Sequence, residues 1–289
     1  MDIQPELASS KMLKPRRTLS RASYTLLSAF LAIILLIIII WWPLVEEYVG
    51  YFNPAYPVWR QLDWLLIGIF LFMSAMIMIK ADLKVDAWIV LVGIFGGLSI
   101  ESWGTQTLLW TYFTNERPPL WIIPAWPIAS LAIDRIYHYL DRLTRRLPEK
   151  FFSALYWIVF TGFLLLMVYF VQPTLDKSLT WMALAVCLLL TFGRNNHRKN
   201  VLLFIAGAGL GYFLERWGTT RECWTYYTHQ TPPLFAVLAH GLATVAFFRV
   251  MDMALDLARV LKDRLPWLSG FPLPEKEPHS SKFSIPPTG

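Results

Sequence analysis

The stretch ESWGTQTLLWTYFTNERPPLWIIPAWPIA, residues 101–129, decides how this chain folds, because a close copy of it follows farther on. The copy reads ERWGTTRECWTYYTHQTPPLFAVLAHGLA and covers residues 215–243. The two stretches align without a gap at an offset of 114 residues, and 13 of their 29 positions are identical. Ordinary residue frequencies would give about two matches by chance. The repetition indicates an internal duplication.

The composition places the chain among membrane proteins. Of its 289 residues 56% are hydrophobic and 16% are charged, and the mean hydropathy is +0.45. Such values lie outside the soluble globular range and predict a polytopic membrane protein. The net charge of +6 does not predict nucleic-acid binding, because the basic residues form short clusters between apolar runs. No C-x-x-C motif or other metal-ligand spacing occurs, and we expect neither a metal nor a cofactor.

A helix that spans a bilayer needs about 20 mostly apolar residues. We predict an all-α protein with eight spans, at Tyr24–Pro43, Trp64–Ile79, Ala87–Glu101, Leu120–Tyr139, Ser153–Val171, Leu179–Phe192, Val201–Glu215 and Pro233–Val250. The first contains the run LAIILLIIII after a basic segment. It is too long for a signal peptide and has no small-residue cleavage site after it, which favours an uncleaved anchor.

The offset of 114 residues carries the second span onto the sixth, so the spans divide into two halves of four helices. An even number of spans in each half makes the halves parallel repeats, related by an axis along the membrane normal. We expect the repeats at residues 24–140 and 153–251, joined by a cytoplasmic linker at 141–152. A basic tail at 1–23 precedes them, and an amphipathic, proline-rich and disordered tail at 252–289 follows.

Lys and Arg predict the orientation. The two tails and the loops after the second, fourth and sixth spans hold 21 of these residues, with Arg135 and Arg249 counted among them, and the opposite loops hold five. We therefore predict a multi-pass protein of the cell membrane with both termini in the cytoplasm. Both repeated stretches then lie at the outer face.

Glu101 and Glu215 are the candidate catalytic carboxyl groups. Each follows 15 residues after the last inner polar residue, Asp86 or Asn200, which is about 22 Å along a helix. Because the apolar layer is roughly 30 Å thick, both should lie in its outer part. A carboxyl group there marks a functional site by default, and one kept protonated can act as a general acid. The alternative is structural: each Glu accepts a hydrogen bond from Thr105 or Thr219 and holds the loop.

Other residues of the two stretches also allow two interpretations. The aromatic residues form either a belt at the lipid boundary or the wall of a site. Gly93 and Gly97, like Gly207 and Gly211, allow helices to approach closely in lipid. His240 is either a hydrogen-bonded structural residue or a base paired with Glu215. The candidate substrate-binding residues are Trp103, Thr105, Trp110, Tyr112, Trp126, Trp217, Thr219, Trp224, Tyr226 and His229.

The order E-x-x-G, aromatic-x-Tyr, Pro-Leu and Pro-x-Ala-Trp resembles the polytopic membrane proteins of carotenoid biosynthesis, the carotenoid hydratases and the lycopene cyclases. The matching residues are Glu101, Gly104, Trp110, Tyr112, Pro119, Leu120, Pro124, Ala125 and Trp126. The resemblance covers about 30 residues in each half. It implies cofactor-free acid catalysis on a polyene or another isoprenoid, with aromatic rings that stabilise a cation.

Three functions are therefore open. The first is a membrane enzyme that acts on an isoprenoid or another lipid, with membrane lipid and a hydrophobic small molecule as partners. The second is a transporter with pseudo-symmetric halves, although the inner ends of the spans carry no matching polar signature. The third is a structural or assembly protein. The substrate and the oligomeric state are left open.

Overall fold

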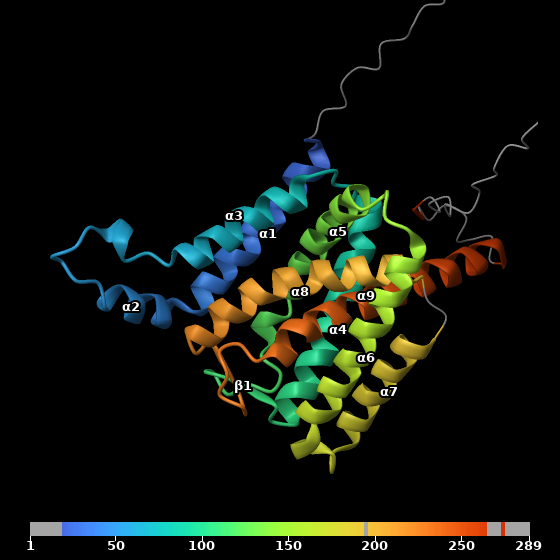
Figure 1. Ribbon diagram of the computed structural model, residues 1–289. Helices are drawn as coiled ribbons and strands as arrows, with labels where there is room; N and C mark the ends of the chain where they lie inside the picture. Colours follow the sequence, from blue (N-terminus) through green and yellow to red (C-terminus); the bar gives the residue numbers. More distant parts are fainter. Residues whose placement is uncertain (1–18, 194–195, 265–272, 275–289) are drawn as a thin grey trace, which may run out of the picture.

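The computed structural model describes residues 19–193, 196–264 and 273–274, and the chain is mostly helical there (Figure 1). The α-helices are α1 Arg21–Ile40, α2 Trp42–Gly50, α3 Trp64–Met78, α4 Leu83–Gln106, α5 Ala125–Leu143, α6 Glu149–Phe170, α7 Ser178–Phe192, α8 His197–Thr220 and α9 Leu234–Arg264. The short elements are η1 Val58–Arg60, β1 Trp110–Tyr112, η2 Leu120–Ile122, η3 Gln172–Thr174 and β2 Trp224–Tyr226.

A helix occupies each of the eight predicted segments, but several bounds differ. α4 and α8 each continue five residues past the glutamate that was predicted to end them. α9 runs to Arg264, so residues 252–264 are helical and do not belong to a disordered tail. The connection between α5 and α6 is only residues 144–148, because both helices extend into the predicted linker. The basic segment before residue 19 and most of the proline-rich tail lie outside the described residues.

Membrane location follows from helix length and apolarity. Within the described residues, four helices are long and apolar enough to cross a bilayer: α1, α4, α6 and the Leu234–Lys262 part of α9. Two shorter helices, α3 and α7, are also apolar. α1 is the most hydrophobic of the four and mostly exposed, as expected of a helix that faces lipid.

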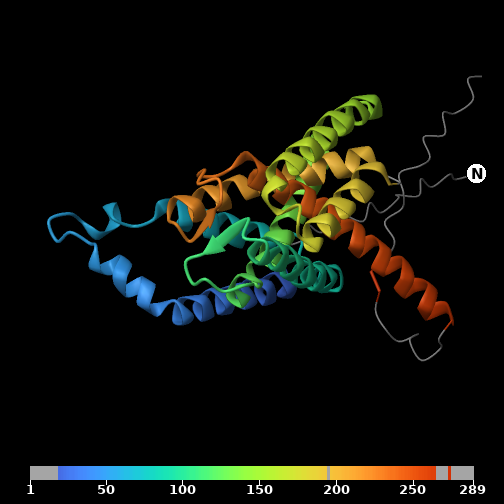
Figure 2. The same ribbon diagram turned by 90° about the horizontal axis from the view of Figure 1, so that it is seen from below.

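Four helices form the centre of the molecule, since α4 packs on α5 and α9, and α8 packs on the same two helices. The pair α1 and α3 lies on one side of this group, and the pair α6 and α7 lies on the other (Figure 1). α2 was not predicted. With the loop that follows, it extends away from the other helices in both views (Figure 1, Figure 2).

Elements of the two halves coincide at the offset seen in the sequence. The bounds of α3, α4 and β1 fall 114 residues before those of α7, α8 and β2. α4 and α8 begin alike, because Asp82 and Asn196 cap them by accepting backbone N–H groups at 3.0 Å. The turns after the helices also match, with left-handed backbone at Leu108 (φ 61°) and Glu222 (φ 55°).

A buried ion cluster ties α3, α4 and α5 together. Arg135 binds Asp86 at 2.7 Å and Asp134 at 2.6 Å, and its Nε donates to the carbonyl of Ile79 at 3.0 Å. Arg135 was counted with the loop residues although it falls within the predicted span Leu120–Tyr139; the count is wrong, because its side chain is only 6% exposed within α5. Arg249, at the same offset, lies within α9. A buried guanidinium is tolerated here because carboxylates and a carbonyl surround it.

We expect Arg135→Leu to lower the free energy of unfolding by about 3–5 kcal/mol, because Asp86 and Asp134 would lose their buried partner. Thermal or denaturant unfolding of the purified protein in mild detergent measures this change. Arg145→Leu is the control, since Arg145 is exposed. Equal stability of the two variants would contradict the assignment.

Candidate functional site

Glu101 is buried in α4, and three side chains donate hydrogen bonds to its carboxyl group. Trp110 Nε1 and Tyr112 Oη reach Oε2 at 3.1 and 3.0 Å, and Trp126 Nε1 reaches Oε1 at 3.1 Å. Two donors come from β1, and the third comes from the start of α5. A carboxyl group that is only 4% exposed needs such partners, because burying an unpaired charge or polar group is costly.

Glu215 has the same surroundings in α8, with one difference. Trp224 Nε1 donates to Oε2 at 2.9 Å, and Tyr226 Oη donates to Oε1 at 2.9 Å. The third partner is His240, whose Nε2 lies 3.0 Å from Oε1. The two carboxyl groups therefore have the same kinds of partner except that an imidazole stands where the first half has an indole. The tyrosines also differ, because Tyr112 shares an oxygen with Trp110 and Tyr226 shares one with His240.

The two clusters form one site, because β1 and β2 pair as an antiparallel two-stranded sheet. Trp110 lies opposite Tyr226 and Tyr112 opposite Trp224, each with ring centroids 5.8 Å apart. The pairing places aromatic donors of one carboxyl group against those of the other. Neither half can complete this arrangement alone.

A third contact joins the halves. Trp126, which donates to Glu101, stacks on His240, which contacts Glu215. Their ring centroids are 5.4 Å apart and the planes differ by 21°. The two carboxyl groups are thus linked through a stacked indole and imidazole.

Repeated glycines make room for these rings. A Cβ atom at Gly104 or Gly218 would overlap the indole of Trp110 or Trp224, and one at Gly97 would overlap Trp126. At Gly211 it would lie 2.5 Å from His240 Cβ. Gly93 instead faces backbone, at 2.8 Å from Pro127 Cα. Gly207 likewise faces backbone, because a Cβ there would lie 2.7 Å from the carbonyl oxygen of His240. The close helix approach predicted for the glycine pairs therefore holds at Gly93 and Gly207, while Gly97 and Gly211 accommodate side chains.

The structural alternatives from the sequence have different outcomes. The hydroxyl groups of Thr105 and Thr219 donate to the backbone carbonyls of Glu101 and Glu215, each at 2.6 Å, and not to the carboxyl groups. The carboxyl groups nevertheless hold the loops, because Trp and Tyr of β1 and β2 donate to them. The motif aromatic residues do not form a lipid-facing belt. Trp110, Tyr112 and Tyr226 are buried, and Trp224 is half-buried.

A cavity of about 960 Å³ adjoins the two carboxyl groups. Its wall is mostly apolar and includes side chains from each of the nine α-helices in the described parts. Glu101, Glu215 and His240 belong to the wall, and none of the described residues that line it is Lys or Arg. The cavity is thus an apolar space. The titratable groups in its described wall are two carboxyl groups, one imidazole, two tyrosines and one cysteine.

The cavity contains most of the predicted substrate-binding residues. They are Trp103, Trp110, Tyr112, Trp126, Trp217, Trp224 and Tyr226. Thr105, Thr219 and His229 are not in its wall, and His229 lies in an exposed turn with φ 54°. Sequence reasoning missed Trp41 and Trp121, which line the cavity and pack edge to face at 4.2 Å. Neither is repeated at the offset, so the duplication could not reveal them.

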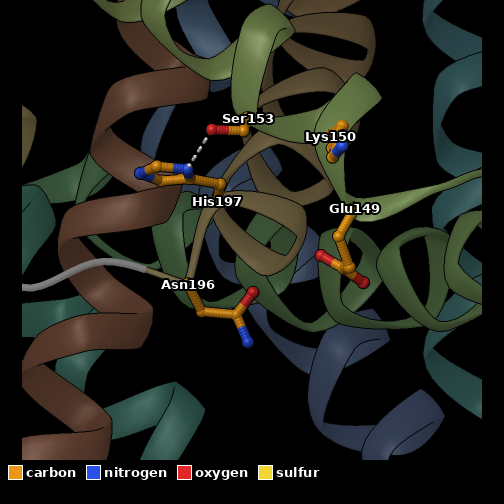
Figure 3. A pocket seen from close by; sticks show the side chains of 5 residues that line it. All are labelled: Glu149, Lys150, Ser153, Asn196 and His197. Atoms are coloured by element: carbon orange, nitrogen blue, oxygen red, sulfur yellow. Dashed lines mark hydrogen bonds between the residues drawn. The ribbon is translucent and has the colours of Figure 1, made fainter.

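A second pocket, of about 500 Å³, lies where α6 and α8 begin (Figure 3). Figure 3 shows His197 pointing to Ser153, with Nδ1 3.0 Å from the hydroxyl oxygen, while Glu149 and Lys150 lie beside them. His197 also stacks on Tyr156 at 4.2 Å. These contacts hold α6 against α8, and we assign this pocket no chemistry.

The main site is suited to proton transfer. A buried carboxyl group next to an imidazole can hold, donate and recover a proton, and both face an apolar space. Among the described residues, no three His, Cys, Asp or Glu side chains lie together as metal ligands would.

No protein family matches this chain, and no curated protein or solved structure matches it either.

We expect Gly211→Ala to push His240 away from Glu215 and to lower the free energy of unfolding by about 1–3 kcal/mol. Gly209→Ala is the matched control on the same helix, because a Cβ there meets nothing within 4 Å. Alanine favours the helix over glycine by up to about 1 kcal/mol, so the control should keep or gain stability. Thermal unfolding in detergent compares the two. A stable Gly211→Ala variant would show that the ring can shift without loss.

Proposed function

We propose that this protein is a membrane-embedded enzyme that acts on an isoprenoid, a polyene or another lipid by carboxylic-acid proton catalysis. The observation that carries the proposal is the pair of buried carboxyl groups, each with three hydrogen-bond partners, in the wall of an apolar cavity. Glu101 or Glu215 is the proton donor, and His240 is the base.

The cavity supports an apolar substrate. Its volume of about 960 Å³ has room for roughly 30 non-hydrogen atoms, if each takes about 30 Å³ as a water molecule does. Protonation of a double bond leaves a cation, and the faces of aromatic rings attract cations. Trp103, Trp121 and Trp217 lie in the same wall as the carboxyl groups. These features agree with the resemblance of the loops to those of carotenoid-biosynthesis membrane enzymes.

We further propose that the chain crosses the cell membrane eight times, as two parallel four-helix repeats. The coincident bounds of α3, α4 and β1 with α7, α8 and β2 support the repeats. The excess of basic residues on one side supports cytoplasmic termini. The site then lies at the outer end of the helix bundle.

Transport is the second candidate function, and the buried ion cluster of Arg135, Asp86 and Asp134 favours it. The sequence argument against transport was the lack of matching polar groups at the inner ends. Arg135 and Arg249 do match at the offset, and Arg135 is buried. Such intramembrane ion pairs occur along ion and substrate pathways. A transporter would release its ligand chemically unchanged.

Mass spectrometry of lipids that copurify in mild detergent tests the enzyme proposal. We expect a specific isoprenoid or polyene to be enriched with the wild type and to change in Glu101→Gln/Glu215→Gln. Glutamine keeps the shape of the side chain but cannot donate a carboxyl proton. Bulk phospholipid alone, equal in both samples, would count against the enzyme. An enriched compound that both samples hold in one chemical form would favour transport.

Cysteine labelling tests the topology. Glu116→Cys and Gln230→Cys are exposed in the two repeated loops, and Arg145→Cys is exposed after α5. We expect a membrane-impermeant maleimide to label the first two in intact cells and the third only after permeabilisation. The opposite pattern would invert the proposed orientation.

The native cysteines should contribute little background. Cys187 is buried in α7, and burial raises the pKa of the Cys223 thiol to about 11. Because the thiolate is the reactive form, Cys223 should react slowly at neutral pH and faster as the pH rises. Labelling of the wild-type protein, which has no introduced cysteine, measures this background.

A further inference from the structure

We propose that Arg249 is the centre of an anion-binding site that holds the phosphate group of a lipid, with the apolar chain of that lipid in the cavity. The site lies at the end of the cavity away from the two carboxyl groups. The inference rests on the proposed function, because it names the head group of the lipid on which the enzyme acts.

Arg249 occupies the same position in the second half as the arginine of the buried ion cluster in the first, but its acidic partners are missing. At the offset of 114 residues, Asp86 aligns with Asn200. Asp134 aligns with Phe248. Both carboxylates that bind the arginine of the first half are therefore replaced by uncharged side chains. The second half keeps the guanidinium without the acids that compensate its charge in the first.

No other described residue replaces these acids. The Nη2 atom of Arg249 is buried and has no hydrogen-bond partner, and no described carboxylate forms an ion pair with this guanidinium. The nearest acid along α9, Asp252, binds Lys199 at 2.6 Å. Arginine cannot lose its charge in a protein, and a buried cation is stable only when an anion or acceptor groups surround it. A ligand is therefore required to supply the anion.

A phosphate group suits this guanidinium. Arginine binds phosphate oxygens through parallel N–H donors, and basic pockets between helices on the cytoplasmic side of a membrane bind phosphate head groups. The space beside Arg249 is free of one side chain, because a Cβ atom added to Gly193 would lie 3.7 Å from its Nη1 atom. The aligned residue of the first half is Ile79, whose carbonyl binds the arginine there.

The wall of the cavity leads to Arg249 along two helices. In α9 the wall includes Ala246, and Arg249 follows three residues later on the same side of the helix. In α7 the wall reaches Leu190, three residues before Gly193. The guanidinium therefore lies just beyond the apolar wall, where the polar end of a bound lipid would leave the cavity.

The first half has no such extension. Ala132 and Met76 align with Ala246 and Leu190, and neither lines the cavity. α3 also packs more extensively on α5 than α7 packs on α9. The cavity thus extends toward the arginine that lacks acidic partners and not toward the one that has them.

The distance along α9 fits the chain of a membrane lipid. Arg249 follows His240 by nine residues, which is about 14 Å along a helix. Half of a hydrocarbon core is about 15 Å thick, and a lipid chain spans this half. A lipid with its phosphate at Arg249 therefore brings the far end of its chain to the level of His240 and the carboxyl groups.

Thermal unfolding of the full-length protein in mild detergent tests the site, with dioleoyl phosphatidic acid, dioleoylglycerol or inorganic phosphate added. Dioleoylglycerol is the matched probe, because it has the same chains without the phosphate. We expect phosphatidic acid to raise the Tm of the wild type with increasing concentration, since a ligand that binds the folded state stabilises it. Dioleoylglycerol and inorganic phosphate should each raise the Tm less.

In Arg249→Gln, we expect the apparent Kd for phosphatidic acid to rise about 10–100-fold, because hydrogen bonds between charged groups are lost. Arg145→Gln is the control for the change in net charge, since Arg145 is exposed, and it should keep the wild-type Kd. An equal Tm shift with dioleoylglycerol, or a wild-type Kd in Arg249→Gln, overturns the site.

Asn200→Asp decides the matter should Arg249→Gln fail to fold. It restores an acid that the first half has, so an internal ion pair should compete with the phosphate and raise the apparent Kd at least about tenfold. A wild-type Kd in Asn200→Asp overturns the site. If inorganic phosphate alone shifts the Tm as much as phosphatidic acid, and only when Arg249 is present, the anion site is supported and the lipid is overturned as its source.

The test measures no turnover, so its failure is distinguishable from that of the proposed enzyme. A Tm shift that depends on Arg249, with copurified lipids unchanged in Glu101→Gln/Glu215→Gln, would support the anion site and count against the enzyme. Changed lipids without such a shift would overturn the anion site alone.

Discussion

The burial of two carboxyl groups within apolar helices is the constraint on which the rest of the site depends. A carboxyl group loses its hydration when it is buried, and the loss is tolerable only if donors replace the water. Here each group has three partners, and most of them are aromatic residues. Indole and phenol groups suit this task, because they bring a polar atom on a large apolar body.

The donors in turn explain the loops and the glycines. Trp and Tyr lie two residues apart in β1 and in β2, so their side chains share one face of the strand. The Trp and the Tyr of each strand therefore reach the same glutamate while the strands pair with each other. The rings lie so close to α4 and α8 that only glycine fits at Gly104 and Gly218. The sheet places each half's donors against those of the other. Both halves therefore build the candidate site.

Much of the helical framework could be predicted, because apolar runs and their periodic interruptions are local properties of the chain. Eight of the nine described α-helices lie where hydropathy places them. The prediction failed where contacts between residues distant in sequence determine the burial of a side chain, and where two helices are continuous in sequence. Arg135 was counted with the loop residues despite falling within a predicted span, yet Asp86 from another helix compensates its charge and allows it to be buried. α2 was missed because its apolar residues are continuous in sequence with α1.

For the candidate site, the duplicated sequence was sufficient to identify Glu101 and Glu215 and most of the residues around them. A carboxyl group within an apolar run can be recognised from the local sequence alone, whatever the tertiary structure. Which groups bind those carboxyl oxygens was decided by tertiary structure. Trp126 and His240 are each 25 residues from their glutamate and stack across the interface between the halves. Hydrogen bonds depend on direction and on a few tenths of an ångström, and these follow only when the helices have packed.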